Sequence, residues 1–298
     1  TQNCYATAGY YFITENDEPV ATIQQKDDNA ARQATTTTLF DDYALYENEL
    51  YNIGNMGRNL YGEDFVYTTT RDFTFDIPGI SGDVTMQVDF VAKLATSAKL
   101  TIKHNGTDLT AGDANNISAF GSSDDWYYTA GKLTTIKKTF TPDPSAPDVI
   151  TLQLKATSPV TARLDYIKLQ MKRELKLYGG AVKFRSLNAS NSYIRYNIDV
   201  TGYNNVHIWD VSEHHSPVEI NAAREGNTLS FTPQTLGVHE YAAFDENVQY
   251  PSPAYIGEVA NQNLHGLERA DLVIICPSQF YSQAKRLAEF HLEHDNIS

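Results

Sequence analysis

The chain has 298 residues, with 23 Lys and Arg against 37 Asp and Glu, so its formal net charge is −14. This acidic balance argues against a nucleic-acid partner, because binding a phosphate backbone requires clustered Lys and Arg. Apolar residues make up 41% of the chain, which is typical of a folded protein. The longest apolar run, Leu272 to Cys276, is far shorter than the roughly 20 residues of a membrane-spanning helix.

The composition also favours β-structure. The chain has 19 Tyr and 13 Phe but only 3 Met, and aromatic side chains fit the half-buried surface of a sheet. Its two cysteines, Cys4 and Cys276, lie near opposite ends, so no disulfide framework can be inferred. The start at Thr1 has neither a basic nor an apolar leader, and we expect the sequence to be part of a longer chain.

The first 38 residues are interpreted as the remnant of an upstream β region. Gly9 to Ile13 reads as one strand, and a lone strand is not stable without a sheet to join. The spacing of Leu39, Tyr43, Tyr46 and Leu50 predicts a short helix from about residue 41 to residue 50.

Residues 39–174 are predicted to form an antiparallel, jelly-roll-like β-sandwich. Between Val84 and Leu94 every second residue is apolar, which indicates a strand with one buried face. Asn105-Gly106 between alternating residues is a strong signal for a β-hairpin. Ile150 to Ala156 and Ile167 to Met171 alternate in the same way.

Two further regions complete the expected architecture. Short strands 8–12 residues apart predict a small Ig-like β-sandwich over residues 175–252. In residues 253–298, Leu272 to Cys276 is typical of a strand buried on both faces, and an amphipathic helix follows Pro277. We expect this last region to be the truncated start of an α/β domain, because one β-α unit cannot bury its own strand.

The candidate binding residues are Trp126, Tyr127 and Asp165. Trp126 and Tyr127 follow a polar stretch with two aspartates, and flat aromatic faces beside carboxylates suit sugar rings. Asp165-Tyr166 resembles the last strand of carbohydrate-binding jelly rolls. The alternative is that Trp126 starts a strand and is buried in the sandwich.

No residue pattern predicts a catalytic, metal or cofactor site. Cys276 is interpreted as a packing residue, since a thiol nucleophile needs a histidine beside it. His291 and His294 lack a third ligand nearby. Gly112 to Asn116 has alternating oxygen ligands, as a calcium loop has, but departs from the 12-residue pattern. We therefore expect no cofactor, with calcium at residues 112–116 as the alternative.

The charge balance reverses between Arg163 and Arg185, where seven cations face two carboxylates. This basic segment is interpreted as solvated strand faces and a linker. The alternative is a contact with an anionic glycan.

Several segments carry a resemblance to a known family, in this order along the chain: Thr38 to Tyr43, Gly57 to Glu63, Asn261 to Leu267, Ala270 to Cys276 and Arg286 to His291. The earlier segments resemble the region upstream of the peptidase domain in type IX secretion sortases. The later ones resemble the entry to a gingipain-like cysteine peptidase domain, so residues 253–298 would begin that domain.

The resemblance implies a protein of the Bacteroidetes outer surface, either secreted or held there. Such sortases cleave C-terminal sorting domains from secreted cargo and join the cargo to an anionic lipopolysaccharide. Their catalytic His and Cys match no residue of this chain, and Cys276 falls on the first strand of the domain, not at the nucleophile. We therefore expect a parent cysteine endopeptidase or transpeptidase, and a chain that is inactive by itself.

The expected function is a non-catalytic β-rich portion that docks protein cargo or outer-membrane partner proteins. The alternative is a carbohydrate-binding β-sandwich module of a secreted or surface protein. A self-contained small enzyme is the third hypothesis, which the missing catalytic motifs disfavour.

Overall fold

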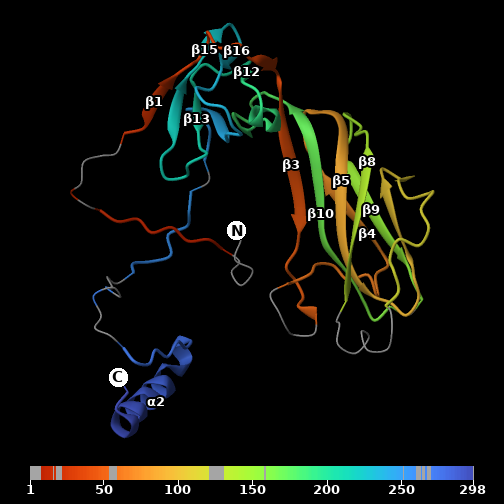
Figure 1. Cartoon of the computed structure of the whole chain (residues 1–298), viewed down its shortest axis with the longest axis vertical. Coiled ribbons are helices and arrows are strands. Elements are labelled where there is room, and N and C mark those ends of the chain that lie inside the picture. Colours follow the sequence, from red (N-terminus) through yellow and green to blue (C-terminus); the bar gives the residue numbers. More distant parts are fainter. Residues whose placement is uncertain are drawn as a thin grey trace. The chain divides into compact units, whose positions relative to one another are not determined.

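The structure of the chain is a computed structural model, which describes residues 8–15, 17, 22–53, 59–120, 131–157, 159–250, 252–259, 263, 266 and 270–297. The chain divides into two compact units, Thr1–Gln249 and Tyr250–Ser298. The first unit contains four β-sheets and the second contains the α-helix α2 (Figure 1). The predicted fold class, mainly β with a helix near the C-terminal end, is confirmed.

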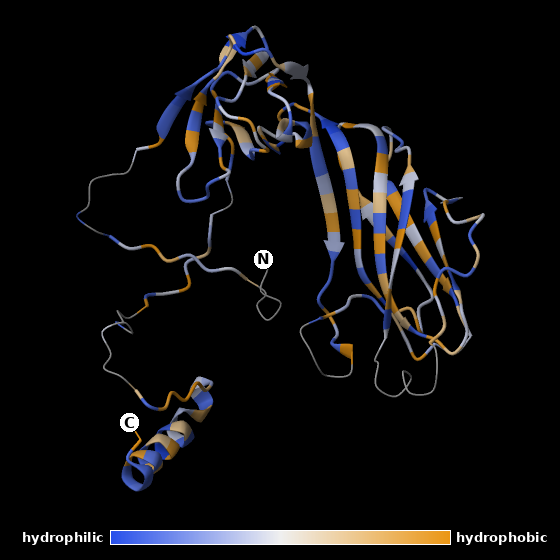
Figure 2. Ribbon diagram, viewed as in Figure 1, coloured by the Kyte–Doolittle hydropathy of each residue, from blue (hydrophilic) through white to orange (hydrophobic). Residues whose placement is uncertain are grey.

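Two four-stranded sheets form the first sandwich, in the strand orders β3-β10-β5-β8 and β4-β9-β6-β7. Their bounds are β3 Leu39–Glu47, β4 Thr70–Phe75, β5 Ile80–Lys93, β6 Lys99–His104, β7 Thr107–Asp108, β8 Lys132–Phe140, β9 Asp148–Lys155 and β10 Thr161–Glu174. One core lies between the sheets, because each strand places alternate apolar side chains inward. Figure 2 shows this alternation as orange and blue bands along β5 and β10.

The alternation predicted for β5 is confirmed residue by residue. Val84, Met86, Val88 and Phe90 are all fully buried. The ring of Phe90 meets Phe65 edge to face, with the ring centroids 5.2 Å apart. This pairing anchors the segment before β4 in the core of the sandwich.

The predicted hairpin at Asn105-Gly106 is also confirmed. His104 pairs with Thr107, so the turn between β6 and β7 has two residues. Asn105 and Gly106 both have positive φ, 45° and 84°. These values are those of a type I′ turn, which matches the twist of the two strands.

The second sandwich pairs a five-stranded sheet, β1-β14-β13-β17-β11, with a four-stranded sheet, β15-β16-β12-β2. Its elements are β1 Gln24–Asp27, β2 Thr35–Thr37, β11 Ala181–Phe184, the 3-10 helix η2 Leu187–Ser190, β12 Ile194–Asp199, β13 Val206–Asp210, β14 Val218–Asn221, β15 Ala223–Glu225, β16 Thr228–Phe231 and β17 Tyr241–Asp245. Phe184, Tyr196, Phe231 and Tyr241 stack at its centre with ring centroids 5.0–6.3 Å apart. Such a packed aromatic cluster supplies most of the apolar area that a small sandwich buries.

The segment before β3 joins this second sandwich. β1 lies parallel to β14, and β2 lies parallel to β12. Asp28, between them, accepts a hydrogen bond from the backbone N–H of Thr232 at 2.7 Å and lies 3.3 Å from Arg195. Residues 24–37 therefore add two strands to sheets formed mainly by residues 181–245.

Two local predictions were wrong. The predicted helix at residues 41–50 is the strand β3, because its Phe40, Ala44 and Tyr46 pack inward while β10 pairs with it along its length. Gly9 to Ile13 forms no strand, and Tyr10 to Ile13 are exposed. Pairing with a neighbouring strand, not local spacing, decided the first case.

Before its helix, the described residues of the second unit are largely without regular structure. Leu272 to Cys276 pairs with no strand within the described residues and Ile275 is 93% exposed, so the predicted strand is not formed there. The predicted helix is confirmed as η4, Ser278–Phe280, continuing into α2, Tyr281–Asp295. No helix in the described part of the chain is long and apolar enough to span a membrane.

Candidate functional site

Of the predicted site residues, Asp165 lies in a β-bulge on the outer face of the first sandwich. On β10, Leu164 pairs with Phe90 of β5, but the next paired residue, Tyr166, is opposite Asp89. Asp165 is thus the extra residue. A bulge sends two successive side chains to the same face of the sheet. Because Leu164 and Ile167, on either side, are fully buried in the core, Asp165 and Tyr166 both face outward.

The bulge brings several carboxylates together. Asp89 of β5 is only 6% exposed, although it lies on the side of β5 opposite the core. Glu47, the last residue of β3, is the partner of Tyr166 across the other edge of β10. We call Glu47, Glu49, Asp89 and Asp165 the acidic patch. No Lys or Arg forms an ion pair with any of the four within the described residues.

Burial, followed by nearby carboxylates, raises the pKa of two members of the acidic patch, Asp165 and Glu49. Burial raises the pKa of Asp165 to about 6, with further contributions from the charges of Asp89, Glu47 and Glu49. The pKa of Glu49 is also raised, first by burial and then by Glu47. Asp165 therefore exchanges its proton near neutral pH, whereas an ordinary aspartate is fully ionised there.

The side-chain amide of Gln87 links the acidic patch to Tyr166. Nε2 of Gln87 donates to Oδ1 of Asp89 at 3.0 Å and lies 2.7 Å from the hydroxyl of Tyr166. Burial, followed by Asp89, raises the pKa of Tyr166, so its hydroxyl keeps its proton. The arrangement offers several acceptors and a few donors on an open surface, which suits ligands with hydroxyl or cationic groups.

The other two predicted binding residues, Trp126 and Tyr127, fall outside the described residues, so their position relative to Asp165 is not described. Asp165 lies near Glu47 and Asp89, and Gln87 contacts Asp89; sequence reasoning selected none of these three. The alternation had placed Gln87 and Asp89 on the outer face, but only the pairing of β5 with β10 brings them to Asp165.

The end of β3 is held by a second polar cluster. Tyr46 donates a short hydrogen bond to Oε1 of Glu63, and Nδ2 of Asn48 donates to the same oxygen at 2.7 Å. Burial and Glu63 together raise the pKa of Tyr46 to about 12, which keeps it a hydrogen-bond donor. This cluster fixes the backbone that leads from Glu47 to Glu49.

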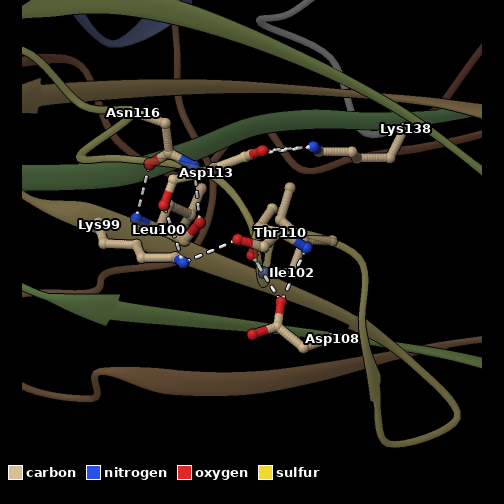
Figure 3. A network of polar contacts seen from close by, with 8 residues as sticks. All are labelled: Lys99, Leu100, Ile102, Asp108, Thr110, Asp113, Asn116 and Lys138. Carbon is tan, nitrogen blue, oxygen red and sulfur yellow. Dashed lines mark hydrogen bonds and ion pairs between the residues drawn. The ribbon is translucent and has the colours of Figure 1, made fainter.

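Two lysines of the chain bind oxygens of the loop at residues 112–116, which was considered for calcium (Figure 3). Nζ of Lys99 donates to the carbonyl oxygens of Thr110 at 2.7 Å and Asp113 at 3.1 Å. Lys138 donates to the carboxylate of Asp113 at 2.9 Å. Asn116 exchanges two hydrogen bonds with the backbone of Leu100, at 2.8 and 2.9 Å.

These contacts use the oxygens that a cation would need. The described residues contain no group of three or more His, Cys, Asp or Glu side chains that could hold a metal ion. Asp108 completes the network by accepting hydrogen bonds from the hydroxyl and N–H of Thr110, and the hydroxyl is the main cause of its lowered pKa. The loop is therefore a structural element that pins residues 108–116 to both sheets.

The basic segment is largely neutralised within the chain. Its ion pairs are Arg163–Asp64 at 3.8 Å, Lys172–Asp41 at 2.6 Å, Arg173–Asp42 at 2.6 Å, Lys176–Glu174 at 2.6 Å and Arg185–Glu240 at 2.9 Å. Only Lys168 and Lys183 of this segment lack an ion pair within the described residues. The segment therefore presents little unpaired positive charge to an anionic partner.

No histidine contacts Cys276 in the described part of the chain. His291 contacts Asp295 at 2.6 Å, and Nδ1 of His294 lies 3.0 Å from the carbonyl oxygen of Phe290. A third histidine, His239, lies between Asp210 and Thr235 at 3.0 and 3.1 Å. Thr235, His239 and Asp210 have the order of a hydrolase triad. Thr235 and His239 lie in one loop and Asp210 ends β13, so these contacts hold the loop against the strand.

Comparison with known proteins gives a fold and no family. No protein-family model and no curated protein matches the sequence. The crystal structure of dimeric latent PorU from Porphyromonas gingivalis matches with a TM-score of 0.74 and 22% identity, over 93% of this chain. This chain spans 26% of that one, so it shares the fold of a part of PorU. A family 35 carbohydrate-binding module from Clostridium thermocellum matches 44% of this chain and 95% of its own length, with 14% identity and a TM-score of 0.27.

Proposed function

We propose that the chain is a non-catalytic, β-rich portion of a cell-surface cysteine peptidase of the type IX sortase kind, and that it docks protein cargo or outer-membrane partners. The observation that carries the proposal is the fold shared with part of PorU over 93% of the chain. The sequence resemblance described above supports it, because the earlier segments resemble the region upstream of the peptidase domain in type IX secretion sortases and the later ones resemble the entry to that domain. The proposed location is the outer surface of a Bacteroidetes cell, or the medium around it.

The docking role is tested by titrating the whole chain with the isolated C-terminal sorting domain of a type IX cargo protein, followed by calorimetry. We expect saturable binding, and an unrelated β-sandwich of similar size and charge serves as the control. Absence of saturable binding to the sorting domain, or equal binding to the control, would contradict the docking role.

The absence of catalysis is tested separately. We expect no thiol-dependent cleavage of a peptide that spans a sorting-domain cleavage site, since the chain has no cysteine–histidine pair in its described part. A Cys276→Ser variant should behave as the wild type does. Cleavage that is lost in this variant would make the chain an enzyme and overturn the proposal.

A carbohydrate-binding module is the second candidate. It is favoured by the combination of Asp165, Tyr166 and Gln87 on an open sheet face, since sugar hydroxyls both donate and accept hydrogen bonds. A glycan array followed by calorimetric titration tests it. Saturable sugar binding that Asp165→Asn weakens supports this function, and binding to no glycan excludes it.

A further inference from the structure

The outer edge of β3 is open. β3 pairs with β10 on one side only and is the first strand of its sheet (Figure 1). The N–H of Asp41 points away from β10, since it donates to the carbonyl oxygen of Arg185 at 3.0 Å. In an antiparallel pair this orientation repeats at every second residue, so the backbone groups of Tyr43, Leu45 and Glu47 point the same way.

Little of this edge is satisfied. The N–H of Tyr43 donates to the carboxylate of the preceding Asp42 at 2.8 Å. Within the described residues, the N–H groups of Leu45 and Glu47 have no acceptor on that side. Two donors, and the carbonyl groups of the same stretch, are therefore free to pair with another extended backbone.

The two edges of this sheet differ in how they are protected. β8, the opposite edge, carries Lys132, Lys137 and Lys138, and lysines on an edge strand discourage pairing with other chains. β3 contains no lysine and exposes Tyr43 by 54% and Leu45 by 48%. An edge strand without lysines, with free backbone donors and exposed apolar side chains, is a template for strand addition.

Charge determines which strand would fit. Glu47 ends this edge, and the rest of the acidic patch continues from it across the outer face of the sheet. No Lys or Arg of the described chain pairs with these carboxylates. Burial is the first cause of the raised pKa of Asp165, and the charges of Asp89, Glu47 and Glu49 add to it. A cationic side chain from outside would offset the repulsion between these charges.

We propose that the open edge of β3 binds an extended strand of a protein partner that carries a lysine or arginine beside Glu47. The proposal rests on the docking role above and gives it a place and a partner chemistry. Main-chain hydrogen bonds to Leu45 and Glu47 supply affinity, as in other cases of strand addition. Apolar side chains of the added strand cover Tyr43 and Leu45. The Cβ atom of its cationic residue lies about 5 Å from the Cβ atom of Glu47, the usual cross-strand spacing.

The experiment uses the whole chain and a blocked nine-residue peptide with valine at the two positions that face Tyr43 and Leu45, lysine at the next position on the same face, which faces Glu47, and threonine elsewhere. The control peptide carries glutamate in place of the lysine. Binding is followed by fluorescence anisotropy, and amide hydrogen exchange locates it. We expect saturable binding of the lysine peptide only, weakened by added salt. The amides of Leu45 and Glu47 should exchange more slowly in the complex, and those of β8 should not change.

Three variants separate the edge from the rest of the sheet. Leu45→Asp and Glu47→Lys should each weaken binding by roughly fivefold, which corresponds to the loss of one good cross-strand pair. Leu133→Asp is the matched control, because Leu133 is 50% exposed on β8, at the opposite edge. Thermal melts of all three check that the sandwich stays folded.

The outcomes are decisive. Lack of lysine-peptide binding, equal binding of both peptides, or protection of β8 instead of β3 would overturn the proposal. If the variants bind a sorting domain as the wild type does, the docking role stands and the assignment to β3 fails. If the wild type binds neither probe, both fail. If the chain self-associates and Leu45→Asp abolishes this, the occupant of the edge is a second copy of the chain. If the amides of the edge are already protected and deletion of residues 1–20 removes that protection, the occupant is the N-terminal segment.

Discussion

The hydroxyl of Tyr178 fills the space that a side chain at Gly79 would need. A Cβ atom built at Gly79 would stand 1.9 Å from this oxygen. The backbone on both sides is fixed, because the hydroxyl donates to the carbonyl of Glu174 at 2.8 Å and the N–H of Glu174 donates to the carbonyl of Gly79 at 2.8 Å. Tyr178 packs against the core of the second sandwich, whereas Gly79 precedes β5 of the first. The contact therefore ties the two sandwiches together.

Gly79→Ala should reduce the free energy of unfolding by roughly 2–4 kcal/mol, as the sum of a positive φ and a steric clash. Gly82→Ala is the matched control, since its φ of 81° is similar but nothing lies within 4 Å of its Cβ position. We expect a loss of about 1 kcal/mol for the control. Urea unfolding measures the free energy of unfolding of both variants. Equal losses would mean that alanine at position 79 does not clash with Tyr178.

His104→Ala should be strongly destabilising. Nε2 of His104 lies 2.7 Å from Oδ1 of Asp148, and both side chains are less than 10% exposed. Removing the histidine leaves a buried carboxylate without its partner, which costs about 3–5 kcal/mol. His207→Ala is the control, because His207 pairs with Glu219 at 2.6 Å but is 41% exposed, and we expect a loss of at most about 1 kcal/mol. Similar losses in denaturant titrations would contradict this account.

Asp165→Asn should stabilise the chain at neutral pH and not in acid. The pKa of Asp165 is raised to about 6 in the folded state, so the protonated form is favoured by folding. This contribution is complete below the unfolded pKa of about 4 and is lost as the pH rises through 6. After allowance for partial exposure, we expect a gain of about 1–2 kcal/mol at pH 8 and none at pH 3.5.

Unfolding in urea at the two pH values measures this difference. Asp76→Asn, at an exposed position after β4, serves as the control and should change stability by less than about 0.5 kcal/mol at either pH. A gain from Asp165→Asn that does not depend on pH would show that charge is not its cause.

Lys99→Met should loosen the loop at residues 108–116. The substitution keeps the length of the side chain but removes two hydrogen bonds from an ammonium group to the carbonyls of Thr110 and Asp113. We expect a loss of about 1–3 kcal/mol and faster amide exchange of residues 110–116. Calcium should leave the melting temperature of the wild type unchanged, since lysines already satisfy these oxygens. A calcium-dependent rise in melting temperature would restore the calcium alternative.

Much of the fold follows from local pattern. The alternation from Val84 to Leu94 and the Asn105-Gly106 turn correctly predicted β5 and the β6–β7 hairpin, because side-chain period and turn chemistry act over a few residues. The helix predicted at residues 41–50 was wrong, because the residues that pack inward are Phe40, Ala44 and Tyr46, which share one face of a strand, and not the set with helical spacing. Pairing with β10 then decided the matter, and a single sequence does not reveal which strands pair.

The amino-acid sequence by itself determined that this acidic, Tyr- and Thr-rich chain forms β-sandwiches, and it placed Asp165 near the start of a strand. Only the tertiary structure decided what surrounds Asp165. The bulge in β10 and its register with β3 and β5 bring Glu47 and Asp89 beside it, although they lie 118 and 76 residues away in the chain. The same pairing leaves one edge of β3 open. Register depends on the packing of the whole core, and that is why the net charge of −14 could not show where the acidic patch lies.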